Sequence, residues 1–105
     1  MLESSMEKIF TQKLQKLGCF VIKCKVEGYA GMPDRQVLIP GGISVFIEMK
    51  KDGEEPRPLQ MYRLKQLNKL GFQAIYINSM GQVQDFVKSV EGQIIHEVSK
   101  EDKHK

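Results

Sequence analysis

Residues 31–50, GMPDRQVLIPGGISVFIEMK, decide the fold. Two runs rich in β-branched and other apolar residues, 35–39 and 43–49, flank the segment Pro40-Gly41-Gly42. Paired glycines between such runs are typical of a tight hairpin, because glycine adopts backbone angles that other residues avoid. We therefore predict two antiparallel strands joined by a turn that is centred on Gly41 and Gly42.

The second run alternates in a way that assigns its two faces, because side chains two apart in a strand point the same way. One face then carries Ile43, Val45, Ile47 and Met49, and the other carries Ser44, Phe46, Glu48 and Lys50. The first face suits coverage by a helix. The second sets a carboxylate and an ammonium group about 7 Å apart along the strand. Taken alone, Glu-x-Lys is common and indicates only a salt bridge at the rim of a sheet.

Asp34 enters the same hairpin from the other strand. If the numbers of paired residues sum to about 83, Asp34 lies opposite residue 49, within a residue or so of Glu48. Two converging carboxylates repel, and the pKa of each rises unless a cation lies between them. Oxygen ligands favour Mg²⁺ or Mn²⁺. For Asp34 alone, the alternative is a turn aspartate that follows Pro33.

The flanking segments supply three helices and two more strands. We expect helices over 4–17, over 58–70 and from Ser79 onward, and strands over 19–26 and 72–77. Pro58 suits a first helical position and Gly71 a helix end. The predicted apolar stripes are Met6, Ile9, Phe10, Leu14 and Leu17; Met61, Leu64, Leu67 and Leu70; and Val83, Phe86, Val87 and Val90. The order α-β-β-β-α-β-α predicts an α/β fold.

Two polar residues fall near these apolar stripes. Gln60 lies close to the centre of the second helix's stripe, and a buried amide needs a hydrogen-bond partner, which the strand carrying Glu48 could provide. A structural amide that holds a loop is the alternative. On the first helix Glu3 lies nearer the stripe than Glu7, so Glu3 is the better candidate to reach inward and Glu7 is the reserve.

Length and composition allow one domain, which we place at residues 1–92, followed by a charged tail at 93–105. The 105 residues carry a net charge of +3 and no apolar run long enough for a membrane span or a signal peptide. Cys19 and Cys24 are too few for a disulfide framework, and their spacing is no zinc signature. We expect reduced cysteines and a cytoplasmic protein without a membrane partner or nucleotide cofactor.

The ordered set Gly31-x-Pro33-Asp34-Arg35, Gly41-Gly42, Phe46-Ile47-Glu48-x-Lys50, Gln60 and Leu70-Gly71-Phe72 resembles the VRR-NUC nucleases. These are a branch of the PD-(D/E)xK superfamily that includes small stand-alone phage and bacterial proteins. The resemblance covers about residues 3–90. It implies a restriction-endonuclease-like core, a mixed sheet of about four strands flanked by helices. It also implies metal ligands at Asp34, Glu48 and Glu3, a catalytic lysine at Lys50 and a supporting catalytic glutamine at Gln60.

The resemblance further implies a Mg²⁺-dependent DNA endonuclease for which Mn²⁺ can substitute. Branched DNA such as a Holliday junction, a role in DNA repair and a homodimer are the finer expectations, with Tyr62 and Met80 as candidate interface positions. The residues considered for nucleic-acid contact are Arg35, Lys51, Arg57, Arg63, Lys13, Lys16 and Tyr29. A restriction-type or exonucleolytic enzyme is one alternative, and a DNA-binding module without turnover is another. Cleavage of RNA stays open.

Overall fold

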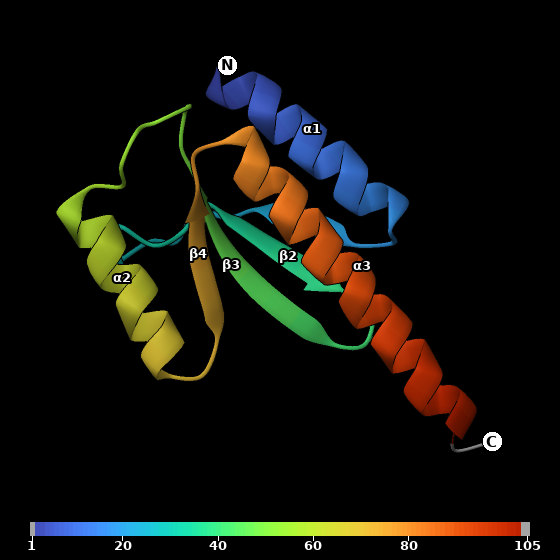
Figure 1. Ribbon diagram of the computed structural model, residues 1–105. Helices are drawn as coiled ribbons and strands as arrows, with labels where there is room; N and C mark the ends of the chain where they lie inside the picture. Colours follow the sequence, from blue (N-terminus) through green and yellow to red (C-terminus); the bar gives the residue numbers. More distant parts are fainter. Residues whose placement is uncertain (1, 104–105) are drawn as a thin grey trace.

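The computed structural model of the protein describes the backbone of residues 2–103 and the side chains of residues 2–96. Its seven elements follow in the predicted order, α-β-β-β-α-β-α, as Figure 1 shows. They are α1 (Glu3–Lys16), β1 (Phe20–Lys23), β2 (Arg35–Ile39), β3 (Ile43–Met49), α2 (Pro58–Lys69), β4 (Gln73–Ile77) and α3 (Met80–Lys103). The predicted α/β class is therefore confirmed.

The four strands form one mixed sheet in the order β1-β2-β3-β4. The pairs β1–β2 and β2–β3 are antiparallel, whereas β3 and β4 are parallel. A parallel pair needs a crossover connection, and α2 supplies it. The sheet is thus the predicted mixed sheet of four strands flanked by helices.

The hairpin register differs by one residue from the prediction. Arg35 pairs with Ile47 and Ile39 pairs with Ile43, so the paired numbers sum to 82 rather than 83. The turn has three residues instead of two, because Gly41 and Gly42 both take positive φ angles, of 102° and 84°, and Pro40 precedes them. Continued by one residue, the observed register sets Asp34 opposite Glu48 itself.

Helices cover both faces of the sheet, and the larger core lies under α1 and α3. Figure 1 shows these two helices side by side, and the rings of Phe10 and Phe86 meet between them at 5.7 Å. This core contains Met6, Phe10, Leu14, Val37, Val45, Ile47, Met49, Ile77, Val83, Phe86, Val87 and Val90. On the other face α2 packs through Leu64 and Leu67 against Ala74, with Phe46 and Met61 beside them. The alternation predicted for β3 is confirmed.

Three details of the elements differ from the sequence prediction. Strand β1 covers only Phe20–Lys23, because it lies at an open edge of the sheet where Phe20 and Ile22 are exposed. Leu70 is exposed, not buried, since it follows the last residue of α2. Met80, a candidate interface position, packs against the larger core, whereas Tyr62 is exposed as expected.

Helix α3 continues past the predicted domain end at residue 92 to Lys103 without a break. No change of secondary structure therefore marks the start of the predicted tail, and the boundary stays a prediction. Residues 104 and 105 of that tail lie outside the described part of the chain. Within 2–103, none of the helices has the length and apolar character that a membrane crossing requires. Both cysteines are free, and burial raises the pKa of the Cys19 thiol.

Candidate active site

Separate segments bring the predicted site residues to one end of the sheet. Helices α1 and α2 begin at the end where the parallel strands β3 and β4 finish (Figure 1). Glu3 opens α1, Glu48 lies at the end of β3, and Gln60 lies in the first turn of α2. Backbone N–H groups at helix starts favour nearby negative charge, so this end of the sheet suits carboxylates and phosphates.

Glu48, Lys50 and Gln60 form a connected group on the α2 face. Gln60 donates from Nε2 to Glu48 Oε1 at 3.0 Å and accepts at Oε1 from the backbone N–H of Arg57 at 2.8 Å. Lys50 Nζ lies 3.8 Å from the same Glu48 oxygen, and both side chains are buried. Gln60 therefore has the polar partner that its place in the helix predicted, and that partner is Glu48.

Asp34 approaches from the strand next to β3. Its Oδ1 accepts the backbone N–H of Met49 at 3.2 Å, which fixes the carboxylate across the strand end that carries Glu48. Its Oδ2 lies 3.0 Å from Nη1 of Arg35. The side chain is partly exposed, so one side of this carboxylate is open to solvent.

The structure brings both helix α1 glutamates to Asp34. Glu3, Glu7 and Asp34 each offer an oxygen within 4.8 Å of the other two. Glu7 forms an ion pair with the buried Arg35, whereas Glu3 forms no ion pair with another residue that the structure describes. Both glutamates that the sequence left open as alternatives therefore face the site. The carboxylate of Glu3 is the more available of the two, because that of Glu7 is paired with Arg35.

Arg35 is the main departure from the sequence interpretation. The sequence makes it a candidate for contact with nucleic acid, but its side chain is buried and pairs with Glu7 and Asp34. A guanidinium group offers several donors in a fixed plane, which lets it hold two carboxylates at once. Its place is thus inside the acidic cluster as a positioning group, because α1 packs over the start of β2.

The crowding of carboxylates changes the pKa of two of them. Burial, and next the charge of Asp34, raise the pKa of Glu48 to about 7, while Lys50 opposes the shift. Burial, followed by the charges of Glu7 and Asp34, raises the pKa of Glu3. An extra positive charge among these groups would relieve the repulsion.

These residues fit a divalent metal ion. Oε2 of Glu48 is buried and has no hydrogen-bond partner among the described residues. A buried carboxylate oxygen without a partner is costly, and ligation of a cation would satisfy it. The available donors are carboxylate oxygens, which suit Mg²⁺ or Mn²⁺ better than softer metals.

Two contributors to the site were missed by the sequence reasoning. Glu54 lies 3.7 Å from Lys50 Nζ and is a second carboxylate beside this ammonium group, in addition to Glu48. Asn78 donates to the backbone oxygen of Glu54 at 3.0 Å and accepts at its own backbone oxygen from Gly53, which fixes the 50–57 loop. A loop has no periodicity to mark Glu54, although an asparagine directly after a buried strand was a weak signal.

The remaining candidates for nucleic-acid contact lie on the surface in three places. Lys13 and Lys16 are exposed on α1, while Lys51 and Arg57 are exposed in the 50–57 loop. Lys51 lies 3.5 Å from Glu54. Tyr29 and Arg63 contact each other beside α2. Of these three pairs, Tyr29 and Arg63 are thus the one whose members hold each other in place.

Comparison with known proteins identifies the family. No known family model matches the chain. A relative from Acyrthosiphon pisum secondary endosymbiont phage 1, named "Putative nuclease p44", is 38% identical over 77 residues, which cover 73% of this chain and 83% of the relative. A solved structure described as "VRR_NUC domain" matches with a TM-score of 0.76 and 29% identity over 82% of this chain and 94% of its own. The chain belongs to the VRR-NUC family of nucleases.

A second solved VRR-NUC structure agrees with the fold. It is described as "VRR_NUC domain protein" and has a TM-score of 0.68 and 20% identity over 86% of this chain and 88% of its own. At that identity the similarity concerns the fold alone. The predicted family and fold are therefore confirmed, and the chain is a nuclease.

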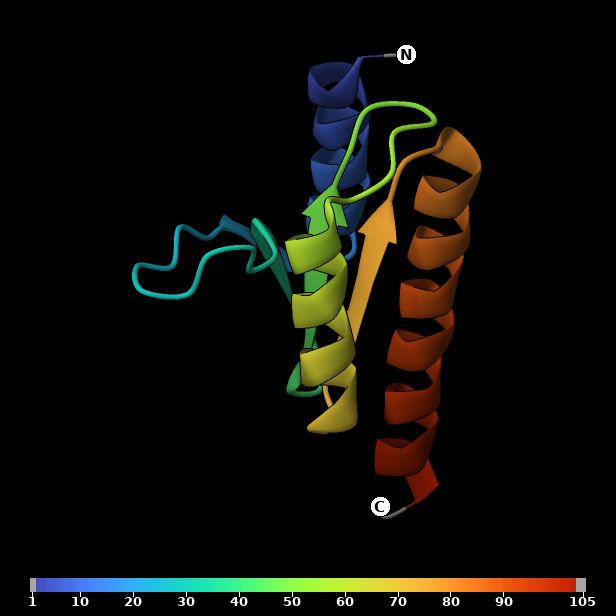
Figure 2. The ribbon, with the colours of Figure 1, turned by 90° about the vertical axis from the view of Figure 1, so that its left-hand side faces the viewer.

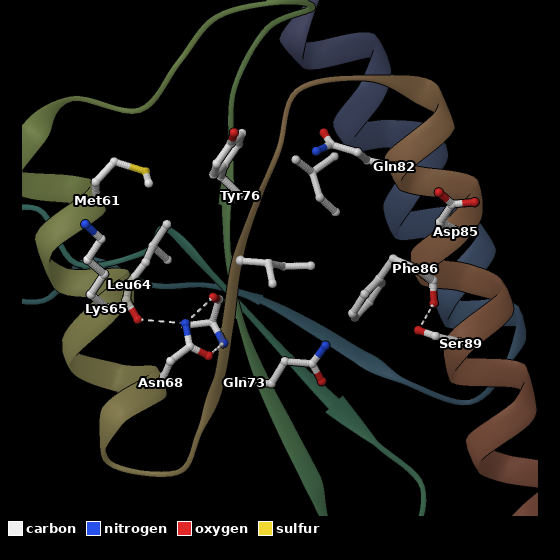
Figure 3. A pocket seen from close by; sticks show the side chains of 13 residues that line it. Met61, Leu64, Lys65, Asn68, Gln73, Tyr76, Gln82, Asp85, Phe86 and Ser89 are labelled. Carbon is white, nitrogen blue, oxygen red and sulfur yellow. Dashed lines mark hydrogen bonds between the residues drawn. The ribbon is translucent and has the colours of Figure 1, made fainter.

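A separate groove of this VRR-NUC chain lies away from the carboxylates. It has a volume of about 540 Å³ and runs along the open edge of β4 between α2 and α3 (Figure 3). Lys65 lines it on the α2 side and Asp85 on the α3 side, and none of the residues predicted for catalysis is among its lining. We therefore place the candidate active site at the carboxylate cluster and not in this groove.

Proposed function

We propose that this nuclease is a Mg²⁺-dependent DNA endonuclease that hydrolyses phosphodiester bonds, with Mn²⁺ able to substitute. The observation that carries the proposal is the buried Glu48 carboxylate, with one oxygen unpartnered and a pKa raised to about 7, beside Asp34 and Lys50. A buried carboxylate oxygen without a partner is less costly when a bound ligand supplies the missing contact. Residues with strongly shifted pKa values are concentrated at functional sites.

Asp34 and Glu48 would hold the metal, with Glu3 as a further ligand and Glu7 in reserve. When bound, Mg²⁺ polarises the scissile phosphate and lowers the pKa of a coordinated water. Lys50, fixed between Glu48 and Glu54, presents its ammonium group to orient the attacking water and to offset charge on the phosphate. Gln60 fixes the orientation of Glu48, and Arg35 fixes that of Asp34.

The finer proposal concerns the DNA structure. A domain of this size offers few surfaces to read base sequence, which favours selection by shape, as on a Holliday junction or a flap, and a role in DNA repair. A homodimer would present two sites to two strands. Branched-DNA preference and dimerisation are both measurable with the purified protein.

The decisive experiment compares two neighbouring lysines. Purified wild type, Lys50→Ala and Lys51→Ala are incubated with end-labelled four-way junction, 5′-flap, single-stranded and duplex DNA in Mg²⁺, Mn²⁺ or EDTA. Lys50 is buried in the site while Lys51 is exposed, so the pair separates a local role from general charge. We expect Lys50→Ala to lose at least about 100-fold in rate, and Lys51→Ala to lose less than about 5-fold.

The same gels distinguish the alternatives. Cutting in EDTA, or equal loss in both lysine variants, would contradict the proposed site. Sequence-dependent duplex cleavage or a requirement for a free end would favour a restriction-type or exonucleolytic enzyme. Binding without cutting by the wild type in either metal would favour a module without turnover.

A further inference from the structure

A second hollow lies between α2 and the loop that precedes Asp34. The backbone N–H of Cys24 donates to the backbone oxygen of Asp34 at 2.8 Å and closes the base of this loop. Figure 2 shows the loop projecting from the sheet. The hollow has a volume of about 690 Å³, within the size range of small-ligand sites. Its lining is Val26, Tyr29, Met32, Arg63, Gln66, Leu67, Lys69 and Leu70.

Arg63 and the exposed Tyr29 line the hollow, and the exposed Tyr62 lies beside Arg63 outside the lining. The Arg63 guanidinium lies 5.6 Å from the ring centre of Tyr29 and 5.8 Å from that of Tyr62, and these rings are 60% and 54% exposed. Arg63 donates to the backbone oxygen of Ala30 at 2.9 Å and to Gln66 at 2.9 Å, so its plane is fixed. Exposed aromatic rings held beside a fixed cation make a platform on which flat rings can stack.

The charge of the hollow and its position both point to nucleic acid. Arg63 and Lys69 are its charged lining residues, and the lining includes no carboxylate. Tyr29 precedes Asp34 by five residues, and Arg63 lies one turn of α2 beyond Gln60, which contacts Glu48. A strand whose phosphate lies at the active site can therefore extend over this hollow.

We propose that the hollow binds unpaired nucleotides, with one base stacked on Tyr29 and the backbone held by Arg63 and Lys69. A base-paired duplex keeps its ring faces inside the helix, so only single-stranded DNA next to the scissile phosphate offers a face to Tyr29. The inference rests on the proposed nuclease function for its substrate class. It adds that, among branched substrates, the enzyme prefers those with an unpaired segment beside the cut, such as a flap, over a fully paired junction.

Binding is tested without cleavage, on Lys50→Ala protein in EDTA. Fluorescence anisotropy compares a labelled single-stranded oligothymidylate, a blunt duplex and the same duplex with a single-stranded overhang. Tyr29→Ala is expected to weaken binding of the single strand and the overhang by about ten-fold or more, with less than a two-fold change on the blunt duplex. Tyr29→Phe keeps the ring and is expected to bind normally.

The control is Phe20→Ala, which removes an aromatic ring of similar exposure from β1, outside the hollow. It is expected to leave all three affinities unchanged. An equal loss in Phe20→Ala, or an unchanged affinity in Tyr29→Ala, would overturn the inference. A hollow that instead pairs two copies of this chain would show a Tyr29-dependent shift in sedimentation without DNA and no Tyr29-dependent binding.

A second measurement needs no substitution in the hollow itself. An oligonucleotide carrying 5-iododeoxyuridine is irradiated with the Lys50→Ala protein, and the linked peptides are sequenced by mass spectrometry. We expect the linkage at Tyr29, which lines the hollow, and linkage only at residues outside the hollow would overturn the proposal. If wild type shows this linkage yet cuts nothing, the proposed endonuclease function is wrong while the inference about the hollow holds. If it cuts but binds independently of Tyr29, only the inference fails.

Discussion

At the residue scale, the two adjacent lysines that follow β3 differ in burial and therefore in expected role. Lys50 is buried between Glu48 and Glu54, whereas Lys51 points to solvent with 65% of its side chain exposed. The period of two in an extended chain sends neighbours to opposite sides, and this rule alone predicted that Glu48 and Lys50 share a face. The same rule cannot give a pKa, since the shift of Glu48 depends on burial by segments far away in the sequence.

The raised pKa of Glu48 makes stability depend on pH. Its folded-state pKa of about 7 lies above the ordinary 4.5, so the folded state keeps a proton that the unfolded chain has lost. The resulting stabilisation is complete below about pH 4.5 and disappears as the pH rises through about 7. Glu48→Gln should therefore raise the free energy of unfolding at pH 8 in EDTA by about 2 to 3 kcal/mol, with little effect at pH 4.5.

Urea unfolding followed by circular dichroism at the two pH values checks this prediction. Glu55→Gln, which removes an exposed carboxylate, serves as the control and should change neither value by more than about 0.5 kcal/mol. An equal gain for Glu48→Gln at both pH values would show that the effect is not ionisation. Mg²⁺ should stabilise wild type at pH 8 and not the Glu48→Gln protein.

At the element scale, the loop before Asp34 is held against α2 by a close contact at Gly31. A Cβ on Gly31 would lie 2.7 Å from Leu59 Cγ and 3.1 Å from its backbone oxygen, whereas one on Gly28 would meet nothing within 4 Å. Both glycines have positive φ, of 83° and 81°. Gly31→Ala should cost about 2 to 4 kcal/mol and Gly28→Ala about 1 kcal/mol, because only the first adds a clash to the backbone strain.

Thermal unfolding of the two alanine variants measures the difference. If Gly31→Ala and Gly28→Ala lose the same stability, the loop does not pack on Leu59. Cleavage should fall in Gly31→Ala alone, since displacement of the loop moves Asp34 away from Glu48. Gly31 stood out in the sequence as part of the set that resembles the VRR-NUC nucleases, but its contact with α2 did not, because the contact joins elements that are distant along the chain.

Strand β4 is an open edge of the sheet that two amide side chains protect. Asn68 donates to the backbone oxygen of Ala74 at 2.7 Å and accepts from its N–H at 3.1 Å, and Gln82 accepts from the N–H of Asn78 at 2.6 Å. These groups occupy positions where a foreign strand would bond. Figure 3 shows Asn68 reaching β4 from α2.

Removal of this protection should promote self-association. Asn68→Ala should destabilise the monomeric fold by about 1 to 2 kcal/mol and give aggregates that grow with protein concentration, as seen by light scattering. Lys65→Ala, in the same groove without a bond to β4, should behave like wild type. Concentration-independent scattering from Asn68→Ala would mean that the edge is protected by other means.

At the scale of the whole molecule, prediction succeeded where local patterns decide and failed where separate elements meet. Element order, the faces of β3 and the contact of Gln60 followed from periodicity. The burial of Arg35 and its pairing with Glu7 did not, because they depend on how α1 lies over β2. The turn length was wrong by one residue, since both a two-residue and a three-residue turn suit Pro40-Gly41-Gly42.

The predicted domain end at residue 92 is open to a direct test. The α3 side chains that are buried, among those described, are Val83, Phe86, Val87 and Val90, while Ile94 is only partly covered and Ile95 is exposed. A chain ending at residue 92 should fold with a loss of about 1 to 2 kcal/mol and keep full cleavage rate. Loss of a cooperative urea transition in that chain would place the boundary later.

The carboxylate cluster draws on residues from Glu3 to Gln60, carried by α1, the hairpin and α2. No single segment contains enough of it to hold a metal ion or orient a water. If the proposed site is correct, we therefore expect no cutting activity from a chain that has not yet folded, nor from a proteolytic fragment that lacks α1. On this proposal, cutting activity would appear only when folding has brought α1, the hairpin and α2 together.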